Sequence, residues 1–594
     1  MKGRTAFQLL EEAAAAYGDR AALHQPYYEN GERKYRTYSW FEYRQIAQEI
    51  AAGLRVLGLS KGDIVAVDSL TRAEFYLIDL GILASGCVSA GLYPSYPSAD
   101  LVAAIRASGA KALVADNPET LSSLRAAEVS HRILLTGEEE GATSLDQLRR
   151  MGRSAIEADP EYFRRIQDEI EPADDAILYQ TSGATGEPKM AMVSHAAVVA
   201  NVDVGPLVLE VGPEDSTVAF LPSAHIAQRL VVEFMLIRMG VPVWFAESLL
   251  KLPHEIKAVR PTLLLAPPRV WERIYATICT EIRKRPALAQ RVYHGALGLG
   301  LEAARRRQRG ETVPAWLRSS LKVADQLVFR KIRERFGGRL RFAISGAAPL
   351  GKQLAEFYDA IGMPVTEGYG LTEGGITIFN PANKARHGSI GKPLPRTEAL
   401  IAEDGELLVR SSFSMSRYFQ DPESTKAVFS DGWLHTGDFA TMDDDGYLFI
   451  AGRKKELIIS STGKKVHPSR IENLFKLEAL FSQVVLVGDR LPYVTALVTI
   501  NQGMAETLKG MESYKGRPPE EIIDSPPVRK EVQEALKRIN RQLAYFEQIR
   551  KYRVLSRDLS IEQGELTATM KVRRKRVLEN FRSDIEELYE GHEL

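Results

Sequence analysis

Hydrophobic and polar residues change between two periods along the first part of the chain. In "YSWFEYRQIAQEIAAGLRVLG" (residues 38–58) the apolar residues recur at helical spacing, whereas "DIVAVDS" (63–69) is an apolar run typical of a short buried strand. "DLVAAIRASGA" followed by "KALVAD" (100–116) repeats this order, and the theme returns at 217–245 and 339–350. Strands separated by helices predict parallel sheets with helices on their faces, so we expect an α/β fold.

Two apolar stretches need separate interpretation. Met1 to Tyr17 has no charged-then-apolar order of a signal peptide, and we expect an amphipathic helix there. The most apolar stretch, Leu77 to Tyr93, is rich in glycine and falls short of the roughly 20 residues that a membrane-spanning helix needs. We predict a buried helix that runs into a strand.

The second half of the chain has a different texture. Glu281 to Gly337 contains long basic helical runs, and within it "GLGLEA" (298–303) matches a dinucleotide-binding fingerprint only formally. That fingerprint needs a preceding strand, and the residues before it are helical in pattern, so we reject it. From Gly432 onward turns and short strands dominate, and from Pro518 we expect two amphipathic helices and a basic tail.

Length and composition narrow the class of protein. A chain of 594 residues is too long for one ordinary core, and 45% hydrophobic with 26% charged residues describes a soluble globular protein. The 77 basic residues balance the 77 acidic ones, so no overall field favours a nucleic acid partner. Only two cysteines are present, which excludes a disulfide framework and fits a cytoplasmic protein.

The stretch "YQTSGATGEPK" (179–189) has the chemistry of a phosphate-binding loop. Its hydroxyl groups are donors, its glycines allow backbone N–H groups to turn toward an anion, and Lys189 adds a positive charge. The Walker pattern G-x-x-x-x-G-K-[ST] is not met. A polar surface turn is the alternative, but the density of donors between a strand-like run and a lysine favours phosphate.

The same stretch resembles the signature loop of the adenylate-forming superfamily, which includes acyl-CoA synthetases, luciferases and peptide-synthetase adenylation domains. Four further motifs follow in the order of that family: "EGYGLTE" (367–373), "DGWLHTGD" (431–438), "GYLFIAGRKKELI" (446–458) and "GELTATMK" (564–571). The similarity begins at "YGDRAAL" (17–23) and covers nearly the whole chain.

The resemblance implies a fold and two domains. Residues 1–453 are expected to form an AMP-binding domain of α/β subdomains with mainly parallel sheets and a small β-barrel-like part. Residues 454–594 are expected to form a small, mobile α+β domain that carries the catalytic lysine. Lys455 aligns with the hinge about which the small domain turns between two half-reactions.

The resemblance also implies the ligands, which are ATP, Mg²⁺ and, as co-substrate, coenzyme A. Lys571, Lys189, Glu373 and Thr185 are the implied catalytic residues, and Glu373 and Thr185 are the implied neighbours of the metal. Tyr369 offers a flat face to adenine and Asp438 can accept hydrogen bonds from ribose. The full set of implied nucleotide contacts is Thr181, Ser182, Gly183, Gly186, Gly346, Ala347, Tyr369, Gly370, Thr372, Asp438 and Arg453.

The acid substrate is less sharply defined. "FLPSAHIAQR" (220–229), "PTLLLAPPRVWERI" (261–274) and the helical insertion most resemble long-chain fatty acid–CoA ligases, and His225 is a candidate for the wall of the acyl site. Alternatives are an acyl-AMP ligase that serves a carrier protein, a ligase for medium-chain or aryl acids, and a non-catalytic sensor. The uninterrupted stretch 452–468 favours coenzyme A over a carrier.

Some expectations stay open at this point. Met190 stands where the family usually has glycine and would crowd the end of the loop after Lys189. We expect only small-molecule substrates and no nucleic acid. Peripheral membrane contact and a homodimer are both compatible with the sequence.

Overall fold

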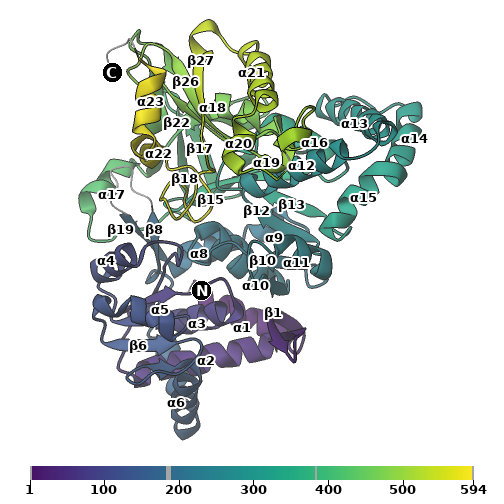
Figure 1. Ribbon diagram of the computed structural model, residues 1–594. Coiled ribbons are helices and arrows are strands. Elements are labelled where there is room, and N and C mark those ends of the chain that lie inside the picture. The colour runs from purple at the N-terminus through teal and green to yellow at the C-terminus, as the bar shows by residue number, and fades with distance from the viewer. Residues whose placement is uncertain (1–2, 182–188, 382–383, 515, 591–594) are drawn as a thin grey trace.

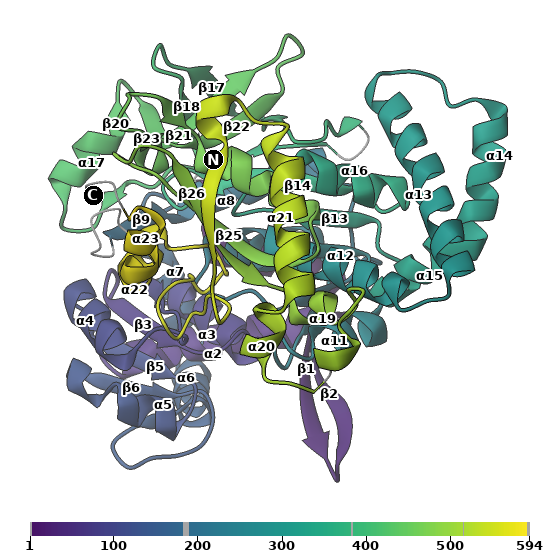
Figure 2. The same ribbon diagram turned by 45° about the horizontal axis from the view of Figure 1, so that its top comes forward.

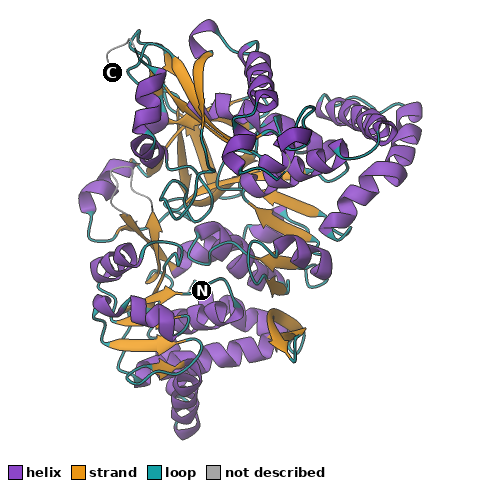
Figure 3. Cartoon of the chain, viewed as in Figure 1, coloured by secondary structure: helices purple, strands orange, loops and turns teal. Residues whose placement is uncertain are grey.

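The computed structural model describes residues 3–181, 189–381, 384–514 and 516–590. Figure 1 shows the early elements at the bottom of the molecule and the last elements at the top, with helices α13 to α15 at one edge. Strands and helices alternate through most of the chain (Figure 3), as an α/β fold requires.

The largest sheet has eight strands in the order β19-β9-β8-β4-β3-β5-β6-β7. Its centre is parallel, with β3 (Ile64–Asp68) between β4 (Val88–Gly91) and β5 (Ala112–Ala115). The next strands are β6 (His131–Leu134), β7 (Thr143–Ser144) and β8 (Asp175–Thr181), and β9 (Lys189–Ser194) and β19 (Arg417–Tyr418) add antiparallel pairs at one edge. The predicted parallel sheet is therefore confirmed at its centre.

Helices of the amino-terminal part pack on this sheet and on one another. They are α1 (Ala6–Tyr17), α2 (Trp40–Val56), α3 (Ala73–Ala84), α4 (Ser98–Ser108), α5 (Pro118–Ser123), α6 (Leu145–Ala158), α7 (Tyr162–Asp168), α8 (His195–Val202) and α9 (Gly205–Val208). Helices α2 and α6 pass so closely that a Cβ at Gly152 would lie 1.8 Å from the carbonyl oxygen of Glu49. Only glycine fits there.

Two further sheets complete the α/β part. A four-stranded sheet has the order β10-β11-β1-β2, with β1 (Ala21–Glu29), β2 (Glu32–Ser39), β10 (Thr217–Ala219) and β11 (Val243–Phe245). A five-stranded sheet runs from β12 (Leu263–Ala266) through β13 (Phe342–Ser345), β14 (Val365–Leu371) and β15 (Gly375–Phe379) to β16 (Lys392–Pro393). Strands β12, β13 and β14 are parallel, so their carboxyl ends meet at one edge.

Antiparallel pairing dominates from residue 397 onward. Strands β17 (Thr397–Ile401), β18 (Glu406–Ser411), β20 (Phe429–Ser430), β21 (Trp433–Met442) and β22 (Leu448–Arg453) form one sheet, where the sequence predicts a barrel-like part. Beyond it, β23 (Ile458–Ile459) pairs with β24 (Lys465–Val466), and β25 (Phe481–Val487), β26 (Val494–Ile500) and β27 (Ile549–Val554) form the last sheet. The mixture of this sheet with helices agrees with the expected α+β region.

The helices of the carboxy-terminal region are more numerous than the sequence predicts. Besides α19 (Gln502–Ala505), α20 (Pro519–Ile523) and α21 (Pro526–Asn540), the supposed basic tail forms α22 (Arg574–Asn580) and α23 (Arg582–Leu588). The basic tail is helical because Val577, Ile585 and Leu588 pack into an apolar cluster with the last sheet.

Other expectations from the hydrophobic pattern are confirmed. The amino-terminal helix begins at Ala6, and Leu77 to Tyr93 is the buried end of α3 followed by β4. The rejected fingerprint at residues 298–303 lies in the middle of helix α13 (Ala287–Gln308). No helix within the described ranges is long and apolar enough to cross a membrane.

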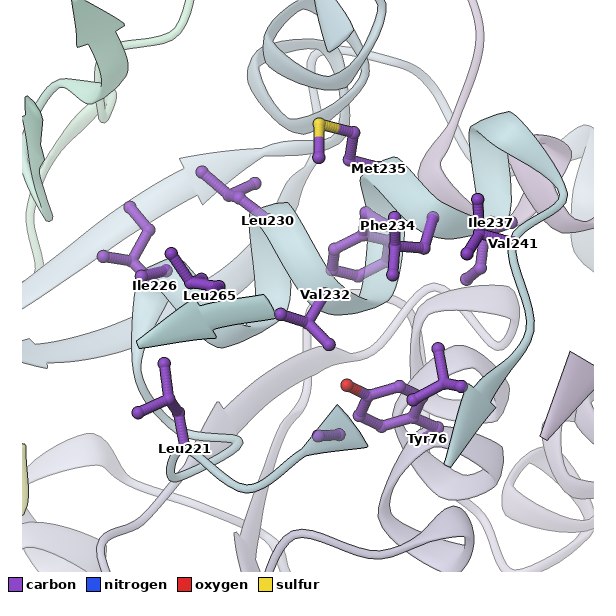
Figure 4. Packing of buried hydrophobic residues seen from close by; sticks show 14 of the residues in the cluster. Tyr76, Leu221, Ile226, Leu230, Val232, Phe234, Met235, Ile237, Val241 and Leu265 are labelled. Carbon is purple, nitrogen blue, oxygen red and sulfur yellow. The ribbon is translucent and has the colours of Figure 1, made fainter. Parts of the chain in front are cut away.

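The buried apolar residues gather in separate clusters. The main one takes its buried members from residues 6 to 418, whereas two others take theirs only from residues 458 to 589. Part of the main cluster is the π-helix η2 (Gln228–Phe234) and the following α10 (Met235–Met239), shown in Figure 4. Ile226, just before η2, lies beside Leu265 of β12 in this cluster (Figure 4).

A helical arm follows β12, the first strand of the five-stranded sheet. It consists of α12 (Pro268–Arg283), α13, α14 (Ala315–Ala324), the π-helix η3 (Asp325–Phe329) and α15 (Arg330–Arg333). Helix α13 packs against α16 (Lys352–Ala360), and α13 to α15 project from the body in both views (Figures 1 and 2). The predicted helical insertion is confirmed.

Candidate active site

A cavity of about 1000 Å³ lies between the amino-terminal sheets and the carboxy-terminal region. It is lined on one side by the ends of β13 and β14 and by β21 and β22, and on the other by residues 469–503 and 556–574. Four of the residues predicted from separate motifs line it together: Tyr369, Asp438, Arg453 and Lys571. The volume is sufficient for a nucleotide.

Asp438 is the centre of a polar cluster in this cavity. It is buried, the hydroxyl of Tyr369 donates to its Oδ2 at 2.7 Å, and the Nε of Arg453 lies 3.2 Å from its Oδ1. Antiparallel pairing of β21 with β22 places Asp438 directly opposite Arg453. Both carboxylate oxygens keep free lone pairs, so the group can still accept bonds from a diol.

Lys571 enters the same cluster from the carboxy-terminal region. It lies in a tight turn, where the N–H of Thr567 donates to the carbonyl oxygen of Lys571 at 2.8 Å. Repulsion from Arg453, together with burial, lowers the pKa of Lys571 to about 8, and Glu456 and Asp438 oppose this shift. The lysine is thus cationic at neutral pH and close to losing its charge.

This pKa predicts the pH dependence of the first half-reaction. Lys571 is protonated below about pH 8 and neutral above it, so activity that needs its charge declines as pH rises through that value. We expect kcat/KM for ATP in acyl-adenylate formation to fall above about pH 8. Lys571→Arg stays charged throughout, and its profile should lose this decline; an unchanged decline in that variant would assign it to another group.

The loop after β13 provides the small residues near the nucleotide position. Ala347 and Ala348 line the cavity, and Ala347 has a left-handed backbone with φ of 71°. Such a conformation is rare for alanine and costs of order 1 kcal/mol or more. Strain in this turn therefore falls on Ala347, whereas Gly346 has an ordinary φ, and a Cβ there would make only an ordinary contact at 3.6 Å with the carbonyl oxygen of Gly368.

Gly370 has a packing requirement of its own. A Cβ at this position would lie 2.4 Å from the carbonyl oxygen of Gly375 on the paired strand β15. The glycine therefore permits the close approach of β14 and β15, while its backbone lines the cavity. Thr372 and Glu373 follow in the turn between these strands.

A second polar group lies around Tyr418. Its hydroxyl donates to Oε1 of Glu373 at 2.6 Å, and the Nζ of Lys189 lies 5.0 Å from its ring centroid. Lys189 also donates to the hydroxyl of Ser424 at 2.6 Å. The predicted phosphate lysine and the predicted magnesium carboxylate thus contact the same tyrosine, although 184 residues separate them in the sequence.

The predicted phosphate-binding stretch is described only at its two ends. Thr181 ends β8, Lys189 begins β9, and the two residues are paired across this hairpin. Ser182, Gly183, Thr185 and Gly186 lie outside the described residues. Met190 packs its partly buried side chain against the apolar cluster of Ile64, Val88 and Leu178.

His225 lines a smaller apolar cavity of about 90 Å³. The other walls include Ile226, Leu230 and Met235 from the segment of Figure 4, and the cavity extends to Gly346, Ala347 and Gly370 of the nucleotide side. Burial, with the charge of Lys571, lowers the pKa of His225 to about 4, so its ring is neutral. A small apolar cavity therefore lies beside the residues that also border the polar cluster.

The orientation of His225 fixes its tautomer. The backbone N–H of Ala227 donates to Nδ1 of the ring at 3.2 Å, so Nδ1 must be the acceptor nitrogen. The remaining proton of a neutral ring is then on Nε2. His225 can donate one hydrogen bond from Nε2 to a carboxylate at the mouth of the apolar cavity.

The expected hinge residue is exposed and makes no part of the cavity wall. Lys455 lies in the short helix η6 (Lys454–Glu456) between β22 and β23. The neighbouring Lys454 pairs with Asp404 at 2.6 Å and with Glu406 at 3.2 Å. The structure therefore places Lys455 at the connection between the two regions.

Contacts between the two regions were not predicted. Lys476 donates to the carbonyl oxygen of Pro349 at 2.5 Å and pairs with Glu272 at 3.1 Å, while Arg269 donates to the carbonyl of Ser482 at 2.6 Å. No signal in the sequence marks these residues, because each partner lies far away along the chain. They hold the carboxy-terminal region over the cavity.

The described residues contain no group of three or more His, Cys, Asp or Glu side chains arranged to hold a metal ion. A magnesium ion bound with a nucleotide commonly takes one or two carboxylates, the phosphates and waters. Glu373, partly exposed and with one oxygen engaged by Tyr418, fits that donor set as a single carboxylate.

Comparisons with known proteins give the relatives of the chain. Residues 10–419 match the family described as AMP-binding enzyme, and residues 455–593 match the AMP-binding enzyme C-terminal domain. The chain is 35% identical over 549 residues to the long-chain-fatty-acid–CoA ligase FadD15 of Mycobacterium tuberculosis, covering 91% of this chain and 90% of that protein. It is 30% identical to the long-chain-fatty-acid–CoA ligase ACSBG2 of Gallus gallus, covering 99% of this chain and 81% of that one.

Solved structures support the fold. The adenylation domain of a carboxylate reductase from Mycobacterium chelonae superposes with a TM-score of 0.76 at 23% identity, covering 99% of this chain and 91% of that one. ATP-bound MatB from Rhodopseudomonas palustris superposes with a TM-score of 0.70 at 22% identity, covering 98% of this chain and 100% of that one.

Proposed function

The chain belongs to the family of AMP-binding enzymes, and we propose that it is an ATP- and Mg²⁺-dependent long-chain fatty acid–CoA ligase. The acid first forms acyl-AMP with release of pyrophosphate, and the acyl group then passes to coenzyme A with release of AMP. The observation that carries this proposal is the closeness of the apolar cavity at His225 to the cavity that contains Asp438, Arg453 and Lys571, since both are lined by Ala347 and Gly370.

The residues around the nucleotide position divide the work of the first step. Asp438 is placed to accept hydrogen bonds from the ribose, beside Tyr369 and Arg453. The cationic Lys571 stabilises the negative charge that develops when a carboxylate oxygen attacks the α-phosphorus. Because the lysine comes from the carboxy-terminal region, this arrangement fits acyl-adenylate formation.

Lys189 and Glu373 serve the other end of ATP in this proposal. Lys189 neutralises charge on the departing pyrophosphate, and Glu373 holds Mg²⁺ near the phosphates, with Thr185 as the assigned neighbour in the part of the chain outside the described residues. When bound, Mg²⁺ neutralises phosphate charge and orients the leaving group. Tyr418 and Ser424 orient the carboxylate and the lysine between them.

The division into residues 1–453 and 454–594, with Lys455 as hinge, belongs to the same proposal. The separate apolar clusters on either side of residue 458 support it. Once the pairs of Lys476 and Arg269 had broken, a turn at η6 would remove Lys571 from the site and admit the thiol.

Pyrophosphate release tests the function directly. The protein is given ATP, Mg²⁺, coenzyme A and a panel of acids from acetate through octanoate and palmitate to aryl and amino acids. We expect release that depends on coenzyme A and is greatest with long-chain acids, because each buried CH₂ contributes about 0.8 kcal/mol. Preference for aryl or medium-chain acids would support that alternative, transfer only to a carrier protein would support the acyl-AMP ligase, and no release with any acid would support the sensor.

The tautomer of His225 predicts how its variants behave. Glutamine places an amide N–H near the position of Nε2, whereas asparagine places its amide near Nδ1 and leaves the ε position empty. We expect His225→Gln to keep most of the acyl-adenylate rate and His225→Asn to lose roughly tenfold, close to the value of one hydrogen bond to a charged group. Steady-state rates at saturating ATP measure both variants; equal losses would contradict the assigned donor.

Membrane contact, cellular location, oligomeric state and partners belong to the same proposal. Peripheral membrane contact fits a substrate that partitions into lipid, and a cytoplasmic location and a homodimer follow only from the sequence. The partners are small molecules, namely the fatty acid, ATP and coenzyme A.

A further inference from the structure

The helical arm is the most strongly charged part of the chain. Residues 283–335 contain fourteen lysines and arginines against four acidic residues, an excess of ten positive charges in a chain whose total is zero. All four acidic residues of this segment are paired: Glu302 with Arg306, Glu311 with Arg309, Asp325 with Arg333 and Glu334 with Arg330.

Seven of these bases have no ion pair within the described residues. They are Arg283, Lys284, Arg285, Arg291, Arg318, Lys322 and Lys331, and all seven are exposed. Arg283 to Arg285 lie where α12 ends, Arg318 and Lys322 lie on α14, and Lys331 lies on α15. The arm therefore presents uncompensated positive charge at the end of α12 and along α14 and α15.

The same arm exposes large apolar side chains. Five of the eighteen exposed large hydrophobic residues in the described part of the chain fall between residues 288 and 327. Leu288 is 72% exposed, Trp316 59%, Val323 56% and Leu327 55%. Exposed single apolar residues are ordinary, but their concentration in one projecting element is not.

Three of them form a stripe on one helical face. Trp316, Val323 and Leu327 are separated by seven and four residues, which is the spacing of side chains on one side of a helix. The neighbouring side of the same helical run, about a quarter of a turn away, is buried through Leu317, Ala324, Phe329 and Ile332. Because the inner face already packs on the body, the Trp316 stripe has no role in the core.

We propose that this face of the arm docks the protein on the surface of a lipid bilayer that contains anionic lipids. Helices that lie in a membrane interface combine a Trp- or Leu-bearing face with flanking lysines and arginines, as the Trp316 stripe and Lys322 and Lys331 do here. Bases near an anionic surface add attraction. The inference deepens the proposed function, because a long-chain acid partitions into the same bilayer.

Vesicle flotation with the full-length protein tests the docking without ATP or acid. We expect the protein to bind vesicles of phosphatidylcholine mixed with phosphatidylglycerol. Its affinity for vesicles of phosphatidylcholine alone should be about tenfold lower, or lower still. Arg318→Glu, Lys322→Glu and Lys331→Glu combined should abolish binding to the mixed vesicles. The matched control combines Lys257→Glu, Lys509→Glu and Lys530→Glu, which are exposed and without ion pairs in the described structure, and it should bind as the wild type does.

The apolar stripe separates a bilayer from other anionic partners. Trp316→Ser with Leu327→Ser keeps every charge and should weaken vesicle binding roughly tenfold. Retained binding in this variant, or equal loss with the control triple variant, would overturn the proposal, as would tighter charge-dependent binding to a DNA duplex than to vesicles.

The catalytic proposal is measured separately on the same variants. Octanoate is soluble, so its coenzyme A-dependent pyrophosphate release needs no membrane, and the arm variants should retain the wild-type rate. Loss of vesicle binding with normal octanoate activity supports docking by the arm, whereas normal vesicle binding without any pyrophosphate release removes only the ligase function.

Discussion

Lys571→Ala is expected to lower the rate of acyl-adenylate formation by roughly 100- to 1000-fold, the usual cost of removing one preorganised charged group from a developing negative charge. Among the described residues that line the cavity, Lys571 is the lysine whose charge interacts with Asp438 and Arg453. The second half-reaction of the Lys571→Ala variant, measured as acyl-CoA formation from supplied acyl-AMP, should be largely unchanged. The reason is that the proposed hinge turn removes Lys571 from the site.

An exposed lysine of the carboxy-terminal region provides the matched control. Lys530→Ala on the exposed side of α21 removes the same charge from the same region and should leave both half-reactions as in the wild type. Equal losses in the two half-reactions of Lys571→Ala would contradict its assignment to the first step alone. Pyrophosphate exchange and thioester formation from synthetic acyl-AMP measure the two steps independently.

The position of Lys571 depends on contacts that lie outside the five motifs. Lys476 with Glu272 and Pro349, and Arg269 with Ser482, fix the carboxy-terminal region so that the turn at residues 567–571 reaches the cavity. Burial raises the free energy of the Glu272 carboxylate, but its two basic partners more than compensate and lower its pKa. These interregional pairs would have to break before the region turned.

The sequence predicts short-range features of the site well. The facing of Asp438 and Arg453 follows from a hairpin in which "DDDGY" (443–447) forms the turn, in the part of the chain where turns and short strands are predicted. Similarly, the apolar run before Thr181 predicts β8, and the apolar run in "FAIS" predicts β13. Local periodicity is sufficient for such elements.

Long-range contacts could not be read in the same way. Tyr418 meets Glu373 across 45 residues, and Lys189 meets Ser424 across 235 residues, because β19 adds to the edge of the large sheet next to β9. Strand β19 has only two residues, too few for a periodic signal. The pairing of strands, rather than any motif, brings these four side chains together.

Two further features run against the local pattern. Ala347, not the adjacent glycine, has the left-handed backbone, since tertiary contacts override local preference at this strained turn. Asp79 stands within an apolar run and forms a fully buried ion pair with Arg229 of the π-helix, with the hydroxyl of Ser89 as a further donor. A charged residue in such a run indicates a partner, but its sequence position does not say which.

Glu373→Gln is expected to have the second large effect, on the use of Mg²⁺ and ATP. The substitution keeps the size of the side chain and its bond from the hydroxyl of Tyr418, now 2.6 Å from Oε1, but removes the negative charge that would hold a hard cation. We expect the adenylation rate to fall by roughly 100-fold or more at limiting Mg²⁺ and to recover in part as Mg²⁺ is raised, since the metal contributes several kcal/mol of charge stabilisation.

Tyr418→Phe keeps the carboxylate and should show a smaller loss. Glu403→Gln, an exposed acid in the turn between β17 and β18, is the matched control and should behave as the wild type does. Initial rates over a matrix of Mg²⁺ and ATP concentrations measure the effect, and an unchanged Mg²⁺ dependence in Glu373→Gln would exclude this residue from the metal site.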